Sequence, residues 1–190
     1  RRAAELFEKN GDTDKALALY RRALAFEPEA RDVFTAIDTL LVREKRAKER
    51  VDLFRAALEH RFEPADRLAT LHVIADLEEN ALGEPEKAIE TYRAALDVEE
   101  RDAASLDALV RLYTSSSRWR DLAELYQRRI DVESDADALA AHRLALAKVF
   151  RSRLDEESSA IDQLEAIVQE QPWNKSALAE LESMTNGEHK

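Results

Sequence analysis

The sequence predicts an all-α protein made of repeated helical hairpins, and three observations support this. Ala, Leu, Glu and Arg dominate the 190 residues, while only three glycines and four prolines interrupt them. No stretch carries the alternating pattern and tight turns that predict strands and hairpins. One amphipathic pattern also recurs at steps of 34, 38, 34 and 38 residues, anchored at Tyr20, Phe54, Tyr92, Tyr126 and Leu164.

The clearest copy of this pattern is the stretch 83–96, GEPEKAIETYRAAL. Gly83 ends one helix, and Pro85 with two glutamates opens the next. The residues that share its apolar face are Ala88, Ile89, Tyr92, Ala95 and Leu96. Such a face needs neighbours on both sides, so we interpret the stretch as one arm of a repeat.

The first repeat combines the back half of a helix with one complete helix. The half helix covers residues 1–9 and is closed by Asn10-Gly11-Asp12. The next helix, near 13–26, is stopped by Pro28, because the residue before a proline is forced out of the helical conformation. Gly11 and Gly83 lie 72 residues apart, the sum of 34 and 38, so two repeats form a larger unit.

The later repeats follow the same plan. Repeat two pairs helices near 30–42 and 47–60, repeat three pairs a longer helix near 64–80 with 83–96, and repeats four and five cover 103–131 and 137–169. The prediction is a single solenoid of residues 1–184. Its repeats lie at about 1–28, 29–63, 64–100, 101–134 and 135–172, with a terminal helix at 174–184 and a tail at 185–190.

The charge and composition exclude several classes of function. A net charge of −11 argues against a general nucleic-acid or anionic-membrane surface, because either needs a dominant basic face. No apolar run approaches the roughly 18 residues of a membrane span. Without cysteine there is no disulfide or thiol chemistry, so the redox compartment stays open and a cytoplasmic location is only the default. The chain starts without Met or a signal peptide, so we expect a piece of a longer protein.

The pattern resembles the tetratricopeptide repeat (TPR) family, whose period is 34 residues, and in particular long bacterial TPR arrays. The residues that carry the resemblance are Leu106, Leu109, Val110 and Tyr113 in a first helix, and Ala16 with Tyr20 and Ala88 with Tyr92 in second helices. The resemblance implies an all-α, right-handed superhelical solenoid of about five TPR-like helix-turn-helix repeats plus a terminal helix.

The chain departs from the family pattern in two ways. Larger residues stand where small ones are usual, at Asp38, Arg50, Val110 and Arg129, so we expect wider helix crossings in repeats two and four. The 38-residue units also lengthen the first helix by nearly a turn.

The resemblance further implies that the first helices line a concave groove. The positions that would face this groove are Thr35, Thr39, His72, Asp76, Asp107, Arg111, Lys148 and Arg151. One hypothesis is that the three cations grip an acidic partner segment, and the alternative is an ordinary solvated face. The Lys and Asn clamp of chaperone-binding TPR proteins is absent, so that partner class is not expected.

Other features have structural and functional alternatives. The basic turn, Arg43, Lys45, Arg46, Lys48 and Arg50, would either dock an acidic protein or form a solvated loop. Trp119 is expected to pack between two helices, whereas Trp173 would be an exposed anchor or would pack under the last helix. His72 and Asp76 lie one helical turn apart, which allows a hydrogen bond, but two ligands are too few for a metal site.

We therefore expect a non-catalytic scaffold that binds a protein or peptide segment along the groove. The part of that segment that meets the C-terminal half of the groove would be acidic. No catalytic or cofactor motif occurs, so no enzyme activity, cofactor or metal is expected, and neither a nucleic acid nor a membrane is an expected partner. The alternatives are a structural spacer, a self-assembling array without a groove ligand, and an accessory region of a larger enzyme or regulator. Self-association stays open.

Overall fold

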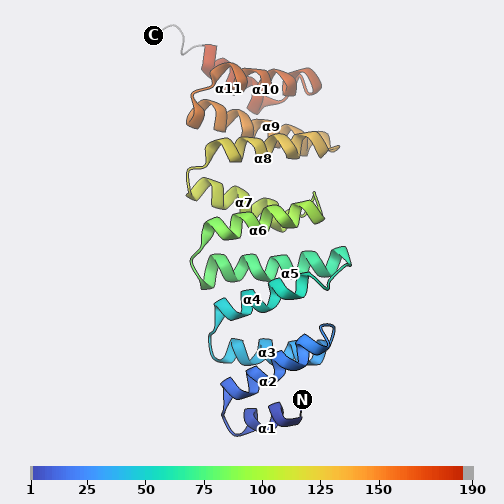
Figure 1. The fold of residues 1–190 in the computed structure, drawn as a ribbon. Helices are drawn as coiled ribbons and strands as arrows, with labels where there is room; N and C mark the ends of the chain where they lie inside the picture. Colours follow the sequence, from blue (N-terminus) through green and yellow to red (C-terminus); the bar gives the residue numbers. More distant parts are fainter. Residues whose placement is uncertain (1, 186–190) are drawn as a thin grey trace. The chain divides into compact units, whose positions relative to one another are not determined.

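The computed structural model describes residues 2–185, and its secondary structure within that range is helical (Figure 1). The all-α prediction is confirmed. The tail beyond Thr185, predicted as part of 185–190, lies outside the described residues. Contacts group the chain into two units, one up to Ser105 and one from Leu106 on. The single solenoid over 1–184 and its right-handed superhelix stay predictions.

The first unit consists of consecutive antiparallel helices that pack side by side in chain order. Its elements are α1 (Arg2–Lys9), α2 (Thr13–Phe26), α3 (Arg31–Arg43), α4 (Ala47–Leu58), α5 (Pro64–Asp76), the π-helical turn η1 (Leu77–Ala81) and α6 (Pro85–Val98). Tyr20, Phe54 and Tyr92, three of the predicted anchors, are buried between neighbouring helices. The sequence period therefore corresponds to the spacing at which aromatic anchors are buried between the helices.

The second unit repeats this arrangement. Helix α7 (Ala103–Ser115) starts at the end of the first unit, and it is followed by α8 (Trp119–Val132), α9 (Ala136–Val149), the π-helical turn η2 (Phe150–Leu154), α10 (Glu157–Glu170) and α11 (Lys175–Thr185). Of the predicted anchors, Leu164 is buried and Tyr126 is half-buried. Ala160, Leu164, Ile167, Ala177 and Met184 belong to one core shared by α9, α10 and α11.

Each turn from the first to the second helix of a hairpin contains one residue with positive φ. These residues are Gly11, Lys45, Gly83, Ser117 and Asp155, with φ between 56° and 78°. They follow one another at 34, 38, 34 and 38 residues, the same steps as the anchors. In the second turn, the N–H of Arg46 donates to the carbonyl of Leu41 and that of Lys45 to Val42, which is a Schellman motif.

The longer first helices of the 38-residue units end in π-helical turns. In η1 the N–H of Leu82 donates to the carbonyl of Leu77, five residues back, at 3.0 Å. The turn η2 stands at the equivalent place, before Asp155. The first helices of the 38-residue units are thus longer, as predicted. The added residues form a wider π-helical turn at the end of each helix and not more regular α-helix.

Two of the large residues at usually small positions, Arg50 and Arg129, form salt bridges to the first helix of their own hairpin. Arg50 of α4 donates from Nε to Asp38 of α3 at 2.7 Å, and Arg129 of α8 donates to Asp107 of α7 at 2.9 Å. In both hairpins a salt bridge between the two helices thus involves a position where the sequence pattern predicted a small residue.

Candidate partner-binding surface

The two threonines of α3 are exposed, but their hydroxyls are already used. Thr35 donates to the carbonyl of Arg31 and Thr39 to that of Thr35, each at 2.8 Å. Both bonds lie within one helix, so the hydroxyl protons are satisfied without a partner protein. These residues offer a partner mainly methyl groups and acceptor lone pairs.

His72 of α5 is half-buried and connects two hairpins. Its Nε2 lies 2.7 Å from Oδ2 of Asp102 and 3.2 Å from Oγ of Ser105, so the hydrogen bond to Asp76 that the sequence allowed is not the one made. The same Asp102 oxygen accepts from the backbone N–H of Ser105 and caps α7. Burial disfavours the Asp102 carboxylate, but the bonds from Ser105 and His72 outweigh it and lower its pKa.

Four of the predicted groove residues belong to the second unit. Asp107 is exposed but bonded to Arg129, and Arg111 is exposed on α7. Lys148 is exposed on α9. Arg151, in η2, donates from Nη1 to Glu180 at 3.0 Å and to the Ser183 hydroxyl at 2.8 Å, both on α11.

A cavity of about 450 Å³ in the second unit brings two of these predicted cations together. Lys148 and Arg151 line it, together with Arg153 and Trp119, whereas Arg111 is not among its lining residues. The guanidinium of Arg153 lies 4.6 Å from the centre of the Trp119 ring, a cation–π contact. The sequence pattern predicts packing for Trp119 and gives no signal for Arg153.

Equivalent positions in the two units carry opposite charges. Asp76 lies seven residues and Glu79 four residues before Gly83, while Lys148 and Arg151 lie seven and four residues before Asp155. Asp76 is exposed and accepts from the Nδ2 of Asn80 at 2.8 Å. The same surface of the repeated unit is therefore acidic in one copy and basic in the other.

Burial shifts the pKa values of two groups near Arg129. Burial raises the pKa of Tyr126, against the opposing charge of Arg129. Burial also lowers the pKa of His142; the charge of Arg129 adds to this, and Glu133, 4.0 Å from its Nε2, opposes it. Neither group lies in the cavity of the second unit.

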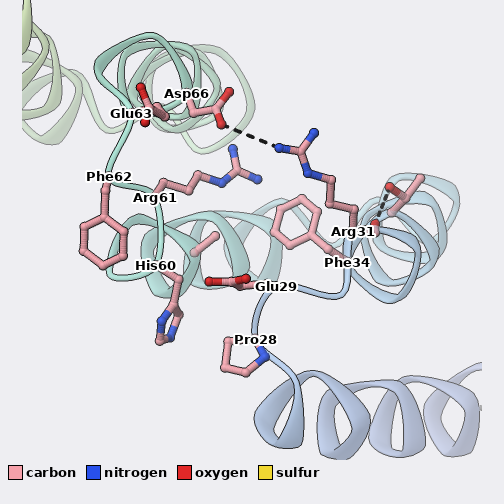
Figure 2. Close-up of a pocket in the computed structure, with 11 residues that line it drawn as sticks. Pro28, Glu29, Arg31, Phe34, His60, Arg61, Phe62, Glu63 and Asp66 are labelled. Atoms are coloured by element: carbon pink, nitrogen blue, oxygen red, sulfur yellow. Dashed lines mark hydrogen bonds and ion pairs between the residues drawn. The ribbon is translucent and has the colours of Figure 1, made fainter.

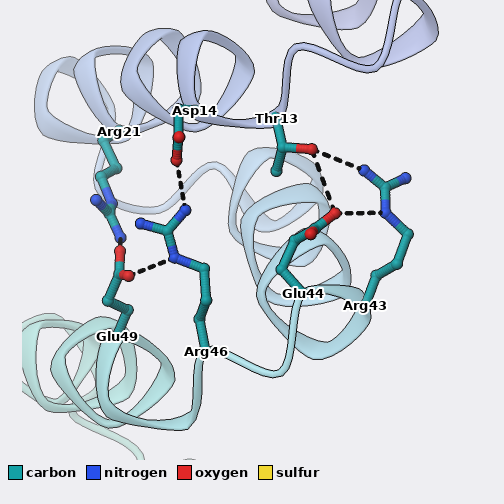
Figure 3. Close-up of polar contacts among 7 residues, drawn as sticks. All are labelled: Thr13, Asp14, Arg21, Arg43, Glu44, Arg46 and Glu49. Carbon is teal, nitrogen blue, oxygen red and sulfur yellow. Dashed lines mark hydrogen bonds and ion pairs between the residues drawn. The ribbon is translucent and has the colours of Figure 1, made fainter.

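The basic turn joins neighbouring hairpins through ion pairs (Figure 3). Arg46 bonds Asp14 of α2 at 2.5 Å and also bonds Glu49, which in turn accepts from Arg21 at 2.5 Å. The hydrogen bond from Arg46 and then that from Arg21 lower the pKa of Glu49 against the effect of burial. Much of the basic charge of the turn is thus neutralised within the chain.

A second cavity, of about 540 Å³, was not predicted (Figure 2). It lies where the loops before α3 and α5 approach each other, and its walls include Phe34, Arg61 and Phe62. Figure 2 shows Arg31 and Arg61 beside the Phe34 ring, with the Asp66 carboxylate directed at Arg31. The ion pair between Arg31 Nη2 and Asp66 Oδ2 spans 3.8 Å. Phe62 is 78% exposed. The sequence could have indicated this exposure, because Phe62 lies beyond the end of α4 and outside its apolar face.

Trp173 is 76% exposed, so the alternative of an exposed aromatic is the one observed. In the described part of the chain, no cluster of His, Cys, Asp or Glu could hold a metal ion. Nor do residues 2–185 contain a helix that is long and apolar enough to cross a membrane.

Helical hairpins at steps of 34 and 38 residues, closed by positive-φ turns around small and aromatic anchors, define a helical-repeat protein. Within that class, the family profile described as tetratricopeptide repeat matches residues 2–32 and 105–140. Those two segments are accordingly similar to tetratricopeptide repeats. Such repeats are in general protein-interaction modules without catalytic activity.

Several solved structures are similar to this chain. YrrB, described as a TPR protein with an unusual peptide-binding site, is 17% identical over 94% of this chain and 88% of its own, with a TM-score of 0.45. The protein TTC0263 of Thermus thermophilus is 16% identical over 96% and 95%, with a TM-score of 0.41. A TPR protein of Parabacteroides merdae is 20% identical over 91% and 66%, with a TM-score of 0.46. A comparison with curated protein sequences gave no significant match.

Proposed function

We propose that this chain is a non-catalytic scaffold that binds a segment of a partner protein along the exposed faces of the first helices of its hairpins. The observation that carries the proposal is the contrast between the equivalent surfaces before Gly83 and Asp155. At positions 72 residues apart, buried packing residues are the same in both units, for example Ala88 and Ala160. At the same spacing, the acidic residues Asp76 and Glu79 are replaced by the basic residues Lys148 and Arg151. A surface that served only solubility would not need this local separation of charge.

The groove candidates contribute unequally to the proposed surface. His72 and Asp107 are committed to contacts inside the chain, and the hydroxyls of Thr35 and Thr39 are bonded to their own helix. Asp76, Arg111, Lys148 and Arg151 remain candidates for recognition because they are charged, although Arg151 is already paired with Glu180 and Asp76 accepts from Asn80. Partner residues that meet Lys148 and Arg151 would be acidic, because opposite charges steer association and favour one register.

The test is selection from a displayed random-peptide library with the immobilised chain as bait. We expect the selected peptides to be enriched in Asp and Glu, and to bind K148E/R151E at least about tenfold more weakly, roughly 1.4 kcal/mol. The matched control is R22E/K48E, which changes the net charge equally at two exposed cations of α2 and α4. Circular dichroism would verify that both variants stay folded.

Two outcomes contradict the proposal. If no peptide is enriched on the immobilised chain over an empty support, the chain does not bind peptides along the groove. If the selected peptides lose the same affinity for K148E/R151E and for R22E/K48E, their binding depends only on the net charge of the chain. Mass that rises with concentration in light scattering, without peptide binding, would favour the self-assembling array instead.

A further inference from the structure

We infer that the cavity of the second unit is an anchor site for a partner segment in which an acidic side chain stands beside a large apolar one. This inference rests on the proposed function and specifies the chemistry of the partner. The cavity is large enough for such an anchor, since ligand sites commonly have volumes of about 300–1,000 Å³. It combines an apolar floor with cations at its rim.

The floor consists of apolar side chains from α8, α9, α10 and α11. Leu122, Leu164 and Met184 form its buried part, and the half-buried Leu144 and Trp119 line it closer to the solvent. An apolar side chain entering this cavity would gain free energy in proportion to the apolar area that it removes from water. The floor therefore explains why an anion alone would not be the best occupant.

The rim carries two cations without a carboxylate partner in the described chain. Among residues 2–185, Lys148 makes no ion pair, and Arg153 contacts only the ring of Trp119 among charged or aromatic groups. Both cations stand beside one apolar cavity in a protein whose net charge is −11. They suit an incoming carboxylate, which would form charge-assisted hydrogen bonds.

The third cation already binds a carboxylate from within the chain. Arg151 is held by Glu180 and Ser183 of α11, and Glu180 also lines the cavity. This contact demonstrates the chemistry that we assign to the rim. It also implies that Glu180 competes with the acidic side chain of a partner.

These groups do not belong to the repeated packing frame. Arg153 occupies the place of Ala81, and Lys148 the place of Asp76, when the two π-helical turns are aligned on Gly83 and Asp155. The cationic rim is thus a property of the second unit alone.

The experiment titrates the ¹⁵N-labelled chain with the blocked peptide Ser-Glu-Leu-Ser and follows backbone amides and the two indole N–H signals by NMR. Matched peptides replace Glu with Gln, Leu with Ala, or both. We expect shifts at the Trp119 indole and at residues 148–153 with the parent peptide, and at least about threefold weaker binding when either side chain is replaced. The exposed Trp173 indole, outside the cavity, is the internal control.

Three variants make the assignment specific. R153Q should weaken the parent peptide about threefold to tenfold, whereas R120Q, which neutralises an exposed arginine of α8 outside the cavity, should not. E180Q should tighten binding about threefold, because it frees Arg151. A purely structural role of Glu180 would give no such gain.

Equal binding of the Leu and Ala peptides, or shifts confined to Trp173, would overturn the anchor site. Self-association in light scattering that K148E abolishes, together with no response to any peptide, would also overturn it. That result would assign the cavity to a second copy of the chain. A different result is that peptides selected from the library bind with an affinity that requires Asp76 but is unchanged in R153Q and E180Q. That result would overturn this inference and leave the proposed function intact.

Discussion

At the scale of single residues, the five positive-φ positions explain why the hairpins close at fixed steps. A residue in this region places its Cβ against the following carbonyl, at a cost of roughly 1–2 kcal/mol for residues other than glycine. Gly11 and Gly83 avoid that cost, but Lys45, Ser117 and Asp155 do not. Only the glycines are visible from the sequence, since the other three are ordinary loop residues by type.

This difference predicts opposite effects of introducing and of replacing a glycine. K45G, S117G and D155G should each raise the free energy of unfolding by about 0.5–1 kcal/mol, because the strain is removed. G83A should lower it by about 1–2 kcal/mol; the cost is conformational, since an added Cβ meets no atom within 4 Å. Urea denaturation would measure all four.

The control for these variants is A69G, on the exposed face of α5, which should lose about 1 kcal/mol because glycine disfavours a helix interior. A stabilised A69G, or a neutral G83A, would contradict the assignment of strain to the turns.

At the scale of elements, the π-helical turn η1 is held by a buried carboxylate. Glu78 is 1% exposed and accepts from Arg55 Nη2 of α4 and from the Thr91 hydroxyl of α6, each at 2.6 Å. It connects the turn to both neighbouring helices. In η2 the equivalent residue is Phe150, packed against an apolar core, so the same element is fixed by different chemistry in each unit.

Removing the carboxylate should destabilise the first unit. We expect E78A to lower the free energy of unfolding by about 2–3 kcal/mol, because Thr91 then loses its buried acceptor and Arg55 its ion pair. The matched change E90A, at an exposed position of α6, should stay within about 0.5 kcal/mol. Thermal and urea unfolding would measure both, and equal effects would show that the contact contributes little.

The sequence predicted the helices better than it predicted the contacts between them. The apolar periods located α2 to α11 because those faces pack directly on neighbours. The contact of His72 with Asp102 has no local signal, since Asp102 lies 30 residues away and η1 and α6 intervene. Glu78 does have one: it stands four residues after Ile74, in phase with the buried face.

For the candidate site, sequence patterns found Lys148 and Arg151 but not the cavity between them. A cavity depends on side chains from several helices, and Arg153 reaches it from η2, at the widened end of α9. A helix wheel of regular α period cannot place residues within a π-helical turn.

At the scale of the whole molecule, repeats that contact only their neighbours should lose stability locally. I89A, a buried residue of α6, should raise amide exchange most in α5 and α6 and least in α10 and α11. Hydrogen exchange followed by mass spectrometry would map the effect. Uniformly faster exchange over residues 2–185 would instead indicate that the predicted solenoid unfolds as one cooperative unit.

The spacing of the positive-φ turns also has a meaning for how such a chain changes in length. Gly11 and Gly83 are separated by one complete double unit and share the same backbone region, with φ of 78° and 66°. Joining Asn10 directly to Gly83 would remove 72 residues and still present a glycine to a helix C-terminus and a second helix of matching pattern to α1. Recombination at these glycines would keep a positive-φ glycine at the joint and exchange only the π-helical turn η1 for the regular end of α1. The turns are therefore positions at which duplication or deletion of a double unit can change the surface while the second helix keeps its packing pattern.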